Sequence, residues 1–282
     1  MAQYINAKVG NRKNIVIYNT SDWHVGSRCF HEKAANELVQ RVKDENAFLT
    51  FGGDAIEGKT IDSPHFNPDG LSAKQLNIHS QAKAFVDILK PIASRVLMIQ
   101  TGNHELYLLR DFDVIEYMCD MLGRPEAYGH YQTWLNVCGV TLHFWHGRPS
   151  MPRGAKDPIQ REANQKAWLK NKMQGLAGSA HAQYMGHTHQ SLIVPPIEQY
   201  ALLDHGENVR GKYFVEEIRT VDGDVWVPPD ARWYVNTGTL RRGGGFDHQD
   251  YSEIAGYTPP PISCTKTTIA DGRVVNIEKV ML

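Results

Sequence analysis

Short apolar runs alternate with helical patterns through the first half of the chain, and this alternation limits the fold more than any other feature. The runs lie at residues 14–20, 47–51 and 96–99. Between them, apolar residues recur at helical spacing over 32–45, and Ser72 with Gln75 reads as a capping box that opens a helix ending near Pro91. This order predicts a mainly parallel sheet with right-handed crossovers, and strands without polar alternation should be buried on both faces.

The rest of the chain predicts a different mix of elements. Residues 105–122 and 158–174 read as helices, and 133–138 with 140–145 reads as a hairpin around Gly139. Further strand signals lie at 183–185, 212–221 and 233–235, with a second hairpin around Asp271. We find no repeat and no clear linker. We therefore expect one domain over residues 1–282, with the motifs in about 13–240 and a loop arm, centred on 243–261, plus the C-terminal hairpin in 241–282.

The composition excludes several classes of protein. Thirty basic and thirty-one acidic residues give a formal net charge of -1, so no global basic excess indicates binding to nucleic acid or membrane. No run of about 18 apolar residues would span a bilayer, and residues 1–14 lack the apolar core of a signal peptide. The four cysteines are widely spaced and form no CxxC pair, which suits a reducing cytoplasm. We expect a cytoplasmic protein without membrane contact.

Five polar clusters stand directly after predicted strands, where parallel sheets build their binding sites. They read DWH, GDAIE, GNHE, HG and GHTH, and they begin at Asp22, Gly53, Gly102, His146 and Gly186. At average residue usage, GNH followed by Asp or Glu arises by chance in only ~0.2% of chains this long. The five clusters in this order therefore indicate one shared site.

Taken together, the five clusters resemble the motif set of the calcineurin-like metallophosphoesterase superfamily, which is matched from Asp22 to His189. The string TSDWHVG at residues 20–26 is more narrowly similar to the SbcD-type DNA nucleases of double-strand-break repair. The resemblance implies an α/β fold, a two-sheet α/β/β/α sandwich of the metallophosphoesterase type. It also implies a phosphoester hydrolase that uses two metal ions.

Seven nitrogen and oxygen donors in these clusters are candidate metal ligands, too many for one ion and suited to two. They are Asp22, His24, Asp54, Asn103, His146, His187 and His189. In extended backbone, side chains two residues apart point to the same side, which predicts that Asp22 and His24 share a side, as do His187 and His189. Four imidazoles favour a transition metal over magnesium or calcium, with manganese as the first expectation and iron or zinc as alternatives.

The resemblance assigns a role to each donor. Asp22, His24 and His189 would hold one ion, Asn103, His146 and His187 the other, and Asp54 would bridge them. A hydroxide bridging the two metals would attack phosphorus in line. His104 would assist the leaving oxygen, oriented by the side chain of Glu57. Part of the family has Asp where this chain has Glu57, so the extra methylene is a departure.

Two further positions separate this chain from the protein Ser/Thr phosphatases. That class carries Arg directly after the second carboxylate, where this chain has Gly58, and its last motif lacks the HxH pair. Other histidines and the tryptophans have simpler interpretations. His143 falls within a strand and is expected to pack, whereas His146 ends that strand. Trp23, Trp145 and Trp168 are expected in the core rather than as platforms for base stacking.

The substrate depends on a local charge pattern. Residues 148–174 carry seven basic against two acidic residues, hence +5, and begin two residues after His146. They form either a track for a polyanion or the solvated face that most charge runs are. On the first interpretation Arg148 and Arg153 bind substrate, and Arg241 with Arg242 extends the track.

This segment and the TSDWHVG string favour a phosphodiesterase or nuclease acting on DNA or RNA. One alternative is a phosphodiesterase or phosphomonoesterase for a small, nucleotide-like substrate, capped by loops at 61–71 and 243–261. A non-catalytic scaffold is a further alternative, disfavoured because no ligand position is lost. SbcD-like nucleases work with an ATPase partner, but only about ninety residues follow His189, which argues against one here. The oligomeric state is left open.

Overall fold

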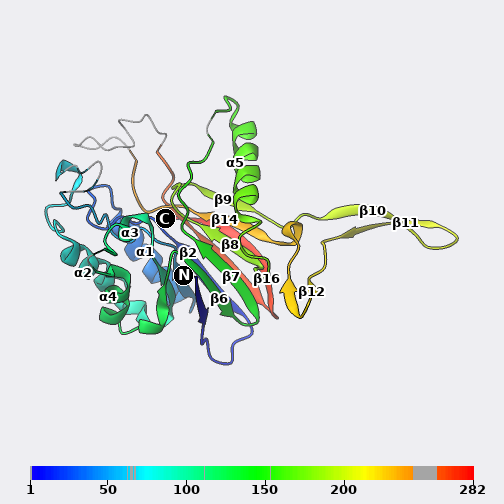
Figure 1. The fold of residues 1–282 in the computed structure, drawn as a ribbon, viewed down its shortest axis with the longest axis horizontal. Coiled ribbons are helices and arrows are strands. Elements are labelled where there is room, and N and C mark those ends of the chain that lie inside the picture. The colour runs from blue at the N-terminus through cyan, green and yellow to red at the C-terminus, as the bar shows by residue number, and fades with distance from the viewer. Residues whose placement is uncertain are drawn as a thin grey trace.

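A computed structural model of the chain describes residues 2–61, 63, 66, 68–110, 112–152, 154–243 and 259–282. Arg153 and most of the expected loop arm lie outside these ranges. Two six-stranded sheets dominate the described part of the chain, and helices lie on both sides of them (Figure 1).

The first sheet contains the three strands predicted from the apolar runs. Its order is β16-β15-β2-β3-β4-β5, in which β2 (Ile15–Thr20), β3 (Phe48–Phe51), β4 (Val96–Gln100) and β5 (Tyr128–Gly129) run parallel. The hairpin of β15 (Ser263–Ala270) and β16 (Arg273–Met281) pairs antiparallel with β2. Every residue of β3 and β4 is buried, as their unbroken apolar sequence predicts.

The second sheet has the order β1-β6-β7-β8-β14-β9 and mixes parallel and antiparallel pairs. Its strands are β1 (Gln3–Asn6), β6 (Gln132–Val137), β7 (Val140–Trp145), β8 (Ala182–Met185), β14 (Trp233–Thr237) and β9 (Ser191–Val194). The predicted hairpin around Gly139 is confirmed by the β6–β7 pairing. The edge strand β1 was not predicted, because four residues with one buried side chain leave little pattern.

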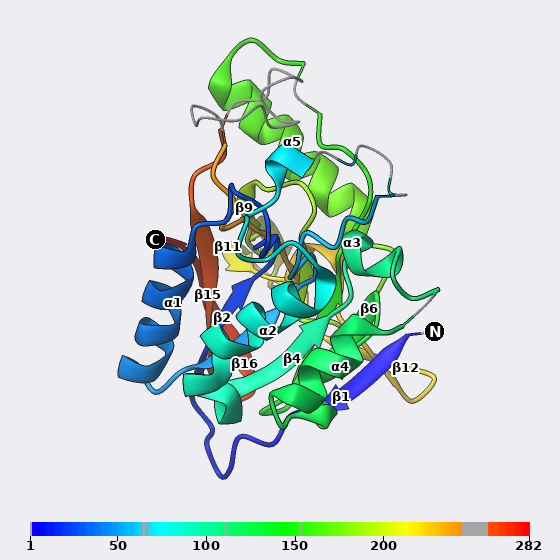
Figure 2. The same cartoon turned by 90° about the vertical axis from the view of Figure 1, so that its left-hand side faces the viewer.

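Three hydrophobic clusters define four layers. The helices α1 (Glu32–Asp44), α2 (Ile78–Leu89) and α4 (Val114–Met121) cover the outer face of the first sheet (Figure 2). Between the sheets, side chains such as Ile17 and Phe48 meet Leu142 and Phe144. On the outer face of the second sheet, α5 (Pro158–Met173) packs through Leu169 and Met173. The expected α/β/β/α layering is confirmed.

Three predicted boundaries were wrong, each for a local reason. The helix α2 begins at Ile78 rather than near residue 72, because Asn77 and Ser80 form the capping box. The helix predicted over 105–122 is split into α3 (Asn103–Leu106) and α4, because the Asp113 side chain accepts hydrogen bonds from Ile115 and Glu116 and starts a new helix. The strand predicted over 212–221 is divided between two hairpins.

Those two hairpins stand apart from the main sheets. One pairs β10 (Gln199–Asp204) with β11 (Val209–Phe214), and the other pairs β12 (Arg219–Val221) with β13 (Asp224–Trp226). Figure 1 shows the β10–β11 hairpin projecting from the body along the longest axis of the molecule. Short 3-10 helices lie at Pro68–Gly70, Lys90–Arg95, Pro125–Ala127 and Pro229–Ala231. Among the described residues, no helix combines the length and apolar character needed to cross a membrane.

Candidate metal centre

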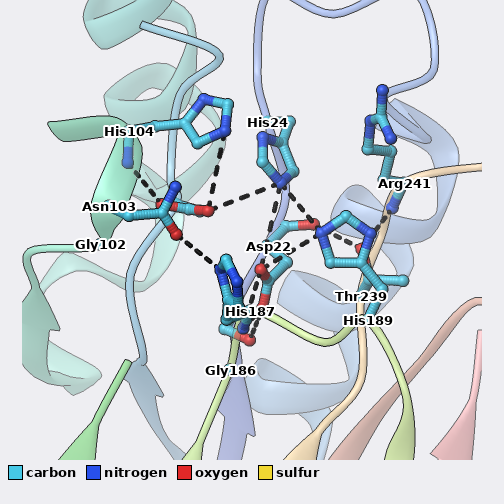
Figure 3. A network of polar contacts seen from close by, with 12 residues as sticks. Asp22, His24, Gly102, Asn103, His104, Gly186, His187, His189, Thr239 and Arg241 are labelled. Carbon is cyan, nitrogen blue, oxygen red and sulfur yellow. Dashed lines mark hydrogen bonds and ion pairs between the residues drawn. The ribbon is translucent and has the colours of Figure 1, made fainter. Parts of the chain in front are cut away.

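The seven expected metal ligands and His104 come together in one site. They lie in the segments that follow the C-terminal ends of β2, β3, β4, β7 and β8, so both sheets contribute. Figure 3 shows Asp22, His24, Asn103, His187 and His189 turned toward one another, with His104 beside them. Their convergence from five separate segments is what the sequence order of the clusters predicted.

One group of donors consists of Asp22, His24 and His189. The Nε2 atoms of His24 and His189 lie 3.2 Å apart. Asp22 Oδ1 lies 3.4 Å from His189 Nε2 and 4.0 Å from His24 Nε2. The three ligand atoms are within 4.8 Å of one another, which suits a single cation between them.

A second group consists of Asp54, His146 and His187, with Asn103 among them. His146 Nε2 lies 3.2 Å from Asp54 Oδ2 and 3.1 Å from Asn103 Oδ1. Asn103 Oδ1 is also 2.7 Å from His187 Nδ1. Asp54 Oδ2 lies 3.8 Å from His24 Nε2, so this oxygen stands between the two groups. The arrangement agrees with the expected placement of Asp54 as a bridge.

The hydrogen bonds that the site residues make to the main chain fit metal binding. His146 Nδ1 lies 2.7 Å from the carbonyl oxygen of Gly52, to which it donates as N–H, so a neutral His146 ring directs its Nε2 lone pair into the site. The main-chain N–H of His104 donates to Asp54 Oδ1 at 2.9 Å, which leaves Oδ2 for the site. Neutral imidazoles and carboxylates with free lone pairs are the form in which these side chains bind divalent cations. The residues present therefore fit a pair of such ions.

The backbone of the ligands differs from the sequence expectation. Asp22, His24, His187 and His189 were expected in extended backbone, but all four have positive φ angles between 51° and 64°, and so does Asp54 at 54°. Residues other than glycine rarely adopt this left-handed conformation, which costs roughly 1–2 kcal/mol each. Such strain concentrates at functional sites. Both side chains of each pair still reach the site: Asp22 and His24 belong to one group of donors, and His187 and His189 belong to different groups.

Two glycines of the motifs are required by close packing at this point. Gly53 has a φ of +95°, and a Cβ there would lie 2.6 Å from His146 Nδ1. A Cβ at Gly102 would lie 2.1 Å from the backbone nitrogen of Asp54. The glycine before Asp54 and the glycine before Asn103 therefore let the two ligand-bearing loops touch.

Asp22 is held in place by His187 and by two residues without a predicted role, Ser21 and Thr239. Its carboxylate accepts hydrogen bonds from the His187 main-chain N–H at 3.0 and 3.1 Å and contacts the hydroxyl of Ser21. Its carbonyl oxygen accepts a 2.7 Å hydrogen bond from Thr239 Oγ1. Thr239 follows β14, and only the fold brings this segment to residue 22. Ser21 is the exception, since it lies within the TSDWHVG string.

A second residue outside the expected roles is Glu105, the last residue of the GNHE cluster. It is fully buried, and its carboxylate accepts three main-chain hydrogen bonds, from Gly102 at 2.8 Å, Asp54 at 3.0 Å and Ile56 at 3.1 Å. Glu105 was not among the predicted site residues. Glu105 instead fastens the loop after β3 to the loop after β4.

The positions of His104 and Glu57 differ in part from the expectation. His104 Nε2 lies 4.0 Å from Asp54 Oδ2, at the edge of the site. Its Nδ1 is 2.5 Å from the main-chain carbonyl oxygen of Glu57, so the backbone of Glu57 orients the ring. The carboxylate of Glu57 instead lies 3.3 Å from His24 Nδ1 and 2.9 Å from the ammonium group of Lys59. Because Glu is one methylene longer than Asp, the Glu57 carboxylate extends beyond His104 and lies near His24 and Lys59.

The electrostatics of the site follow from burial and from the mixture of charges. Burial alone would raise the pKa of Asp54, but the imidazoles of His146 and His104 outweigh burial and hold that pKa well below its usual range. Burial and the neighbouring His104 lower the pKa of His24 to about 4. Burial opposes the charged form of His104, but the carboxylates of Asp54 and Glu57 outweigh it and raise its pKa. Asp54 is thus held anionic and His24 neutral.

The surroundings of the site bear on the substrate. Arg148 is exposed next to the hydroxyl of Tyr131, and the Tyr131 ring lies 6.2 Å from that of His146. On α5, however, Lys166 pairs with Glu162 and Lys170 pairs with Asp230. Much of the basic segment is therefore engaged within the chain.

The remaining expectations for aromatic residues and histidines are met. His143 is fully buried 4.5 Å from the Trp134 ring, and Trp23 is fully buried in the core. Trp145 and Trp168 pack against the cluster under α5. All four cysteines are free, as their spacing predicted.

Comparisons with known proteins add one finding. No protein-family model and no curated protein matches this chain. Among solved structures, the chain is similar to the calcineurin-like phosphoesterase YfkN from Bacillus subtilis, with 12% sequence identity and a TM-score of 0.39, over 95% of this chain and 90% of that one. A likeness this distant is no basis for assigning a function, so the function is inferred from the geometry of the site.

Proposed function

We propose that this chain is a phosphoester hydrolase that acts with two divalent cations. One observation carries the proposal: two buried groups of metal-binding side chains meet at a single carboxylate oxygen, Asp54 Oδ2. Asp22, His24 and His189 would hold one ion, and Asn103, His146 and His187 the other, with Asp54 shared. When bound, such ions supply Lewis acidity, lower the pKa of coordinated water and attract the oxygens of a phosphoester.

The protein's own side chains complete the chemistry. The hydrogen bond from His104 Nδ1 to the Glu57 carbonyl leaves Nε2 facing the site, where it can give a proton to a leaving oxygen. The raised pKa of His104 keeps that proton available near neutral pH. The His104 main-chain N–H and the Glu105 carboxylate hold Asp54 and its loop, so the carboxylate does not reorganise during the reaction.

The proposed substrate is a phosphodiester of nucleic acid. The similarity of residues 20–26 to SbcD-type nucleases supports this choice. Exposed Arg148 beside the site and Tyr107, which is 59% exposed three residues after His104, support it further, since a cation can neutralise a backbone phosphate and an aromatic ring can stack on a base. The pairing of Lys166 and Lys170 within the chain favours the alternative, a small nucleotide-like phosphoester.

Cleavage assays with Mn²⁺-loaded protein test both the proposed hydrolase activity and the proposed nucleic-acid substrate. Bis-p-nitrophenyl phosphate and labelled single- and double-stranded DNA are offered in parallel, with Asp54→Asn as control. Turnover of the small diester that is lost in Asp54→Asn supports the hydrolase. If the small diester is turned over but DNA stays intact, the nucleic-acid substrate is wrong. If protein that carries two ions turns over no ester, the chain is a scaffold and not an enzyme.

Two variants refine the substrate assignment. Arg148→Ala and Tyr107→Ala should each raise KM for DNA while leaving turnover of the small diester unchanged, because both residues lie outside the metal-binding groups. Lys172→Ala, which removes an exposed charge from α5, is the matched control. An effect of Lys172→Ala on the KM for DNA equal to that of Arg148→Ala would mean that only general charge matters.

A further inference from the structure

The carboxylate of Glu57 is buried beside the metal centre, and the proposed reaction does not use it. Only the main-chain carbonyl oxygen of Glu57 orients His104. The side chain extends in another direction and ends between His24 and Lys59. Burying an ionised carboxylate costs free energy unless the charge has partners. The two contacts of this carboxylate therefore indicate its role.

The first contact is with the ring of His24, on the side that faces away from the other metal-binding side chains. Glu57 Oε2 lies 3.3 Å from His24 Nδ1. Both atoms are buried, and neither has a hydrogen-bond partner elsewhere in the described part of the chain. His24 Nε2 lies 3.2 Å from His189 Nε2 and faces Asp22 and Asp54. One nitrogen of the ring thus faces a carboxylate, and the other faces the expected ion.

This contact sets the tautomer of His24. A neutral imidazole has one N–H and one lone pair, and an ionised carboxylate accepts hydrogen bonds but donates none. Burial and the neighbouring His104 lower the pKa of His24 to about 4, so the ring is neutral near pH 7. The N–H therefore belongs on Nδ1, beside Glu57, and the lone pair on Nε2 is directed at the expected ion.

The second contact keeps Glu57 in its charged form. Burial alone would raise the pKa of the Glu57 carboxyl group, but His24, His104 and Lys59 outweigh burial and lower that pKa. The Lys59 ammonium group lies 2.9 Å from Glu57 Oε1. Lys59 thus balances the charge at one oxygen and leaves Oε2 to His24.

We infer that Glu57 is a positioning residue for the metal ligand His24 rather than for His104, an inference that rests on the proposed metal centre. A carboxylate behind a ligating imidazole fixes the ring and its tautomer and makes the ligating nitrogen more basic. His146, by comparison, is backed by the neutral carbonyl oxygen of Gly52. The Glu57 carboxylate therefore strengthens the group formed by Asp22, His24 and His189.

A third metal site is the other interpretation of this carboxylate, because His24, Glu57 and His104 are close enough together to hold a cation. Two contacts argue against it. The Lys59 ammonium group already supplies a positive charge at Glu57 Oε1. A neutral His24 has one lone pair, which the group with Asp22 and His189 uses. The three residues therefore support the metal centre rather than extend it.

Calorimetric titration of metal-free protein with Mn²⁺ tests the role of Glu57. Wild type should show two binding events, and His189→Ala, which removes one ligand, identifies the event at the group with Asp22 and His24. Glu57→Gln keeps the size of the side chain but removes its charge. It should weaken that event about 10–100-fold and leave the other unchanged. Its kcat should recover at saturating Mn²⁺.

Two further variants separate an oriented contact from general charge. Glu57→Asp keeps the charge but is one methylene shorter, which withdraws the carboxylate from His24 Nδ1, so it should weaken the same event. Glu37→Gln, which removes an exposed carboxylate from α1, is the control and should bind as wild type does. Circular dichroism of the metal-free proteins checks that each variant is folded. A Glu57→Asp variant with wild-type affinity would show that charge alone is sufficient.

A double substitution separates the two histidines. We expect Glu57→Gln to weaken Mn²⁺ binding equally in wild type and in a His104→Ala background. Loss of the weakening in that background would assign the carboxylate to His104. Unchanged affinity in Glu57→Gln, with two ions bound to wild type, would overturn the inference and leave the metal centre standing. A wild type that binds no Mn²⁺ would instead refute the metal centre itself.

Discussion

Glu105 gives the sharpest test of how the site is built. Its buried carboxylate accepts hydrogen bonds from three main-chain N–H groups, those of Gly102, Asp54 and Ile56. Glu105→Ala leaves these donors buried without a partner. Each unsatisfied donor costs about 1–3 kcal/mol. Relief of the repulsion between Glu105 and Asp54 offsets part of this cost, so we expect a loss of about 3–6 kcal/mol in the free energy of unfolding.

The assay is urea unfolding of metal-free protein, followed by both circular dichroism and tryptophan fluorescence. Coincident transitions and unchanged m-values would justify comparing free energies. Glu105→Gln should cost less than Ala, because its amide oxygen can still accept hydrogen bonds from Gly102 and Asp54. The control is Glu162→Ala, which removes only an exposed pair with Lys166 and should change stability by less than about 0.5 kcal/mol. A Glu105→Ala variant within about 1 kcal/mol of wild type would refute the role assigned to this carboxylate.

Three further predictions concern the same centre. Gly102→Ala should abolish Mn²⁺ binding, because its Cβ would displace Asp54, whereas Gly175→Ala, which meets open space, should bind as wild type does in a calorimetric titration. Mn²⁺ at 100 times its dissociation constant should stabilise the protein against thermal unfolding by about 2.7 kcal/mol per site, an effect that a chelator reverses and Asp54→Asn removes. Burial and Asp54 raise the pKa of Glu105 to about 7, above its value in the unfolded chain. The contribution of Glu105 to the free energy of unfolding is therefore complete below the unfolded pKa and is lost as the pH rises through about 7. In metal-free protein, Glu105→Gln should therefore lower the free energy of unfolding more at pH 5 than at pH 8. A loss that is the same at both pH values would contradict the raised pKa of Glu105.

The sequence predicted the framework of the fold because burial leaves a strong pattern. Strands such as β3 and β4 are buried on both faces and read as unbroken apolar runs. The seven candidate ligands were predicted to lie together because each cluster follows a predicted strand, and parallel strands deliver their C-terminal ends to one edge. The helix boundaries near residues 77 and 113 were missed because side-chain caps, rather than periodicity, set them.

The support around the ligands was harder to predict. Thr239 contacts Asp22 although the two residues are 217 positions apart, so only the fold, in which β14 pairs with β8, reveals this contact. The left-handed backbone at Asp22 and His24 was not predicted, although Asp and His adopt this conformation more often than most other residues do. The direction of the Glu57 carboxylate depends on one methylene group and on Lys59, which was not considered.

The central claim is that two divalent cations share Asp54, and metal content tests it most directly. Protein freed of metal, incubated with Mn²⁺ and passed through a desalting column, is assayed for manganese per chain. The account predicts two ions per chain in wild type and at most one in Asp54→Asn with the fold intact. A wild type that retains one ion or none, or an Asp54→Asn variant that retains two with unchanged affinity, would contradict it.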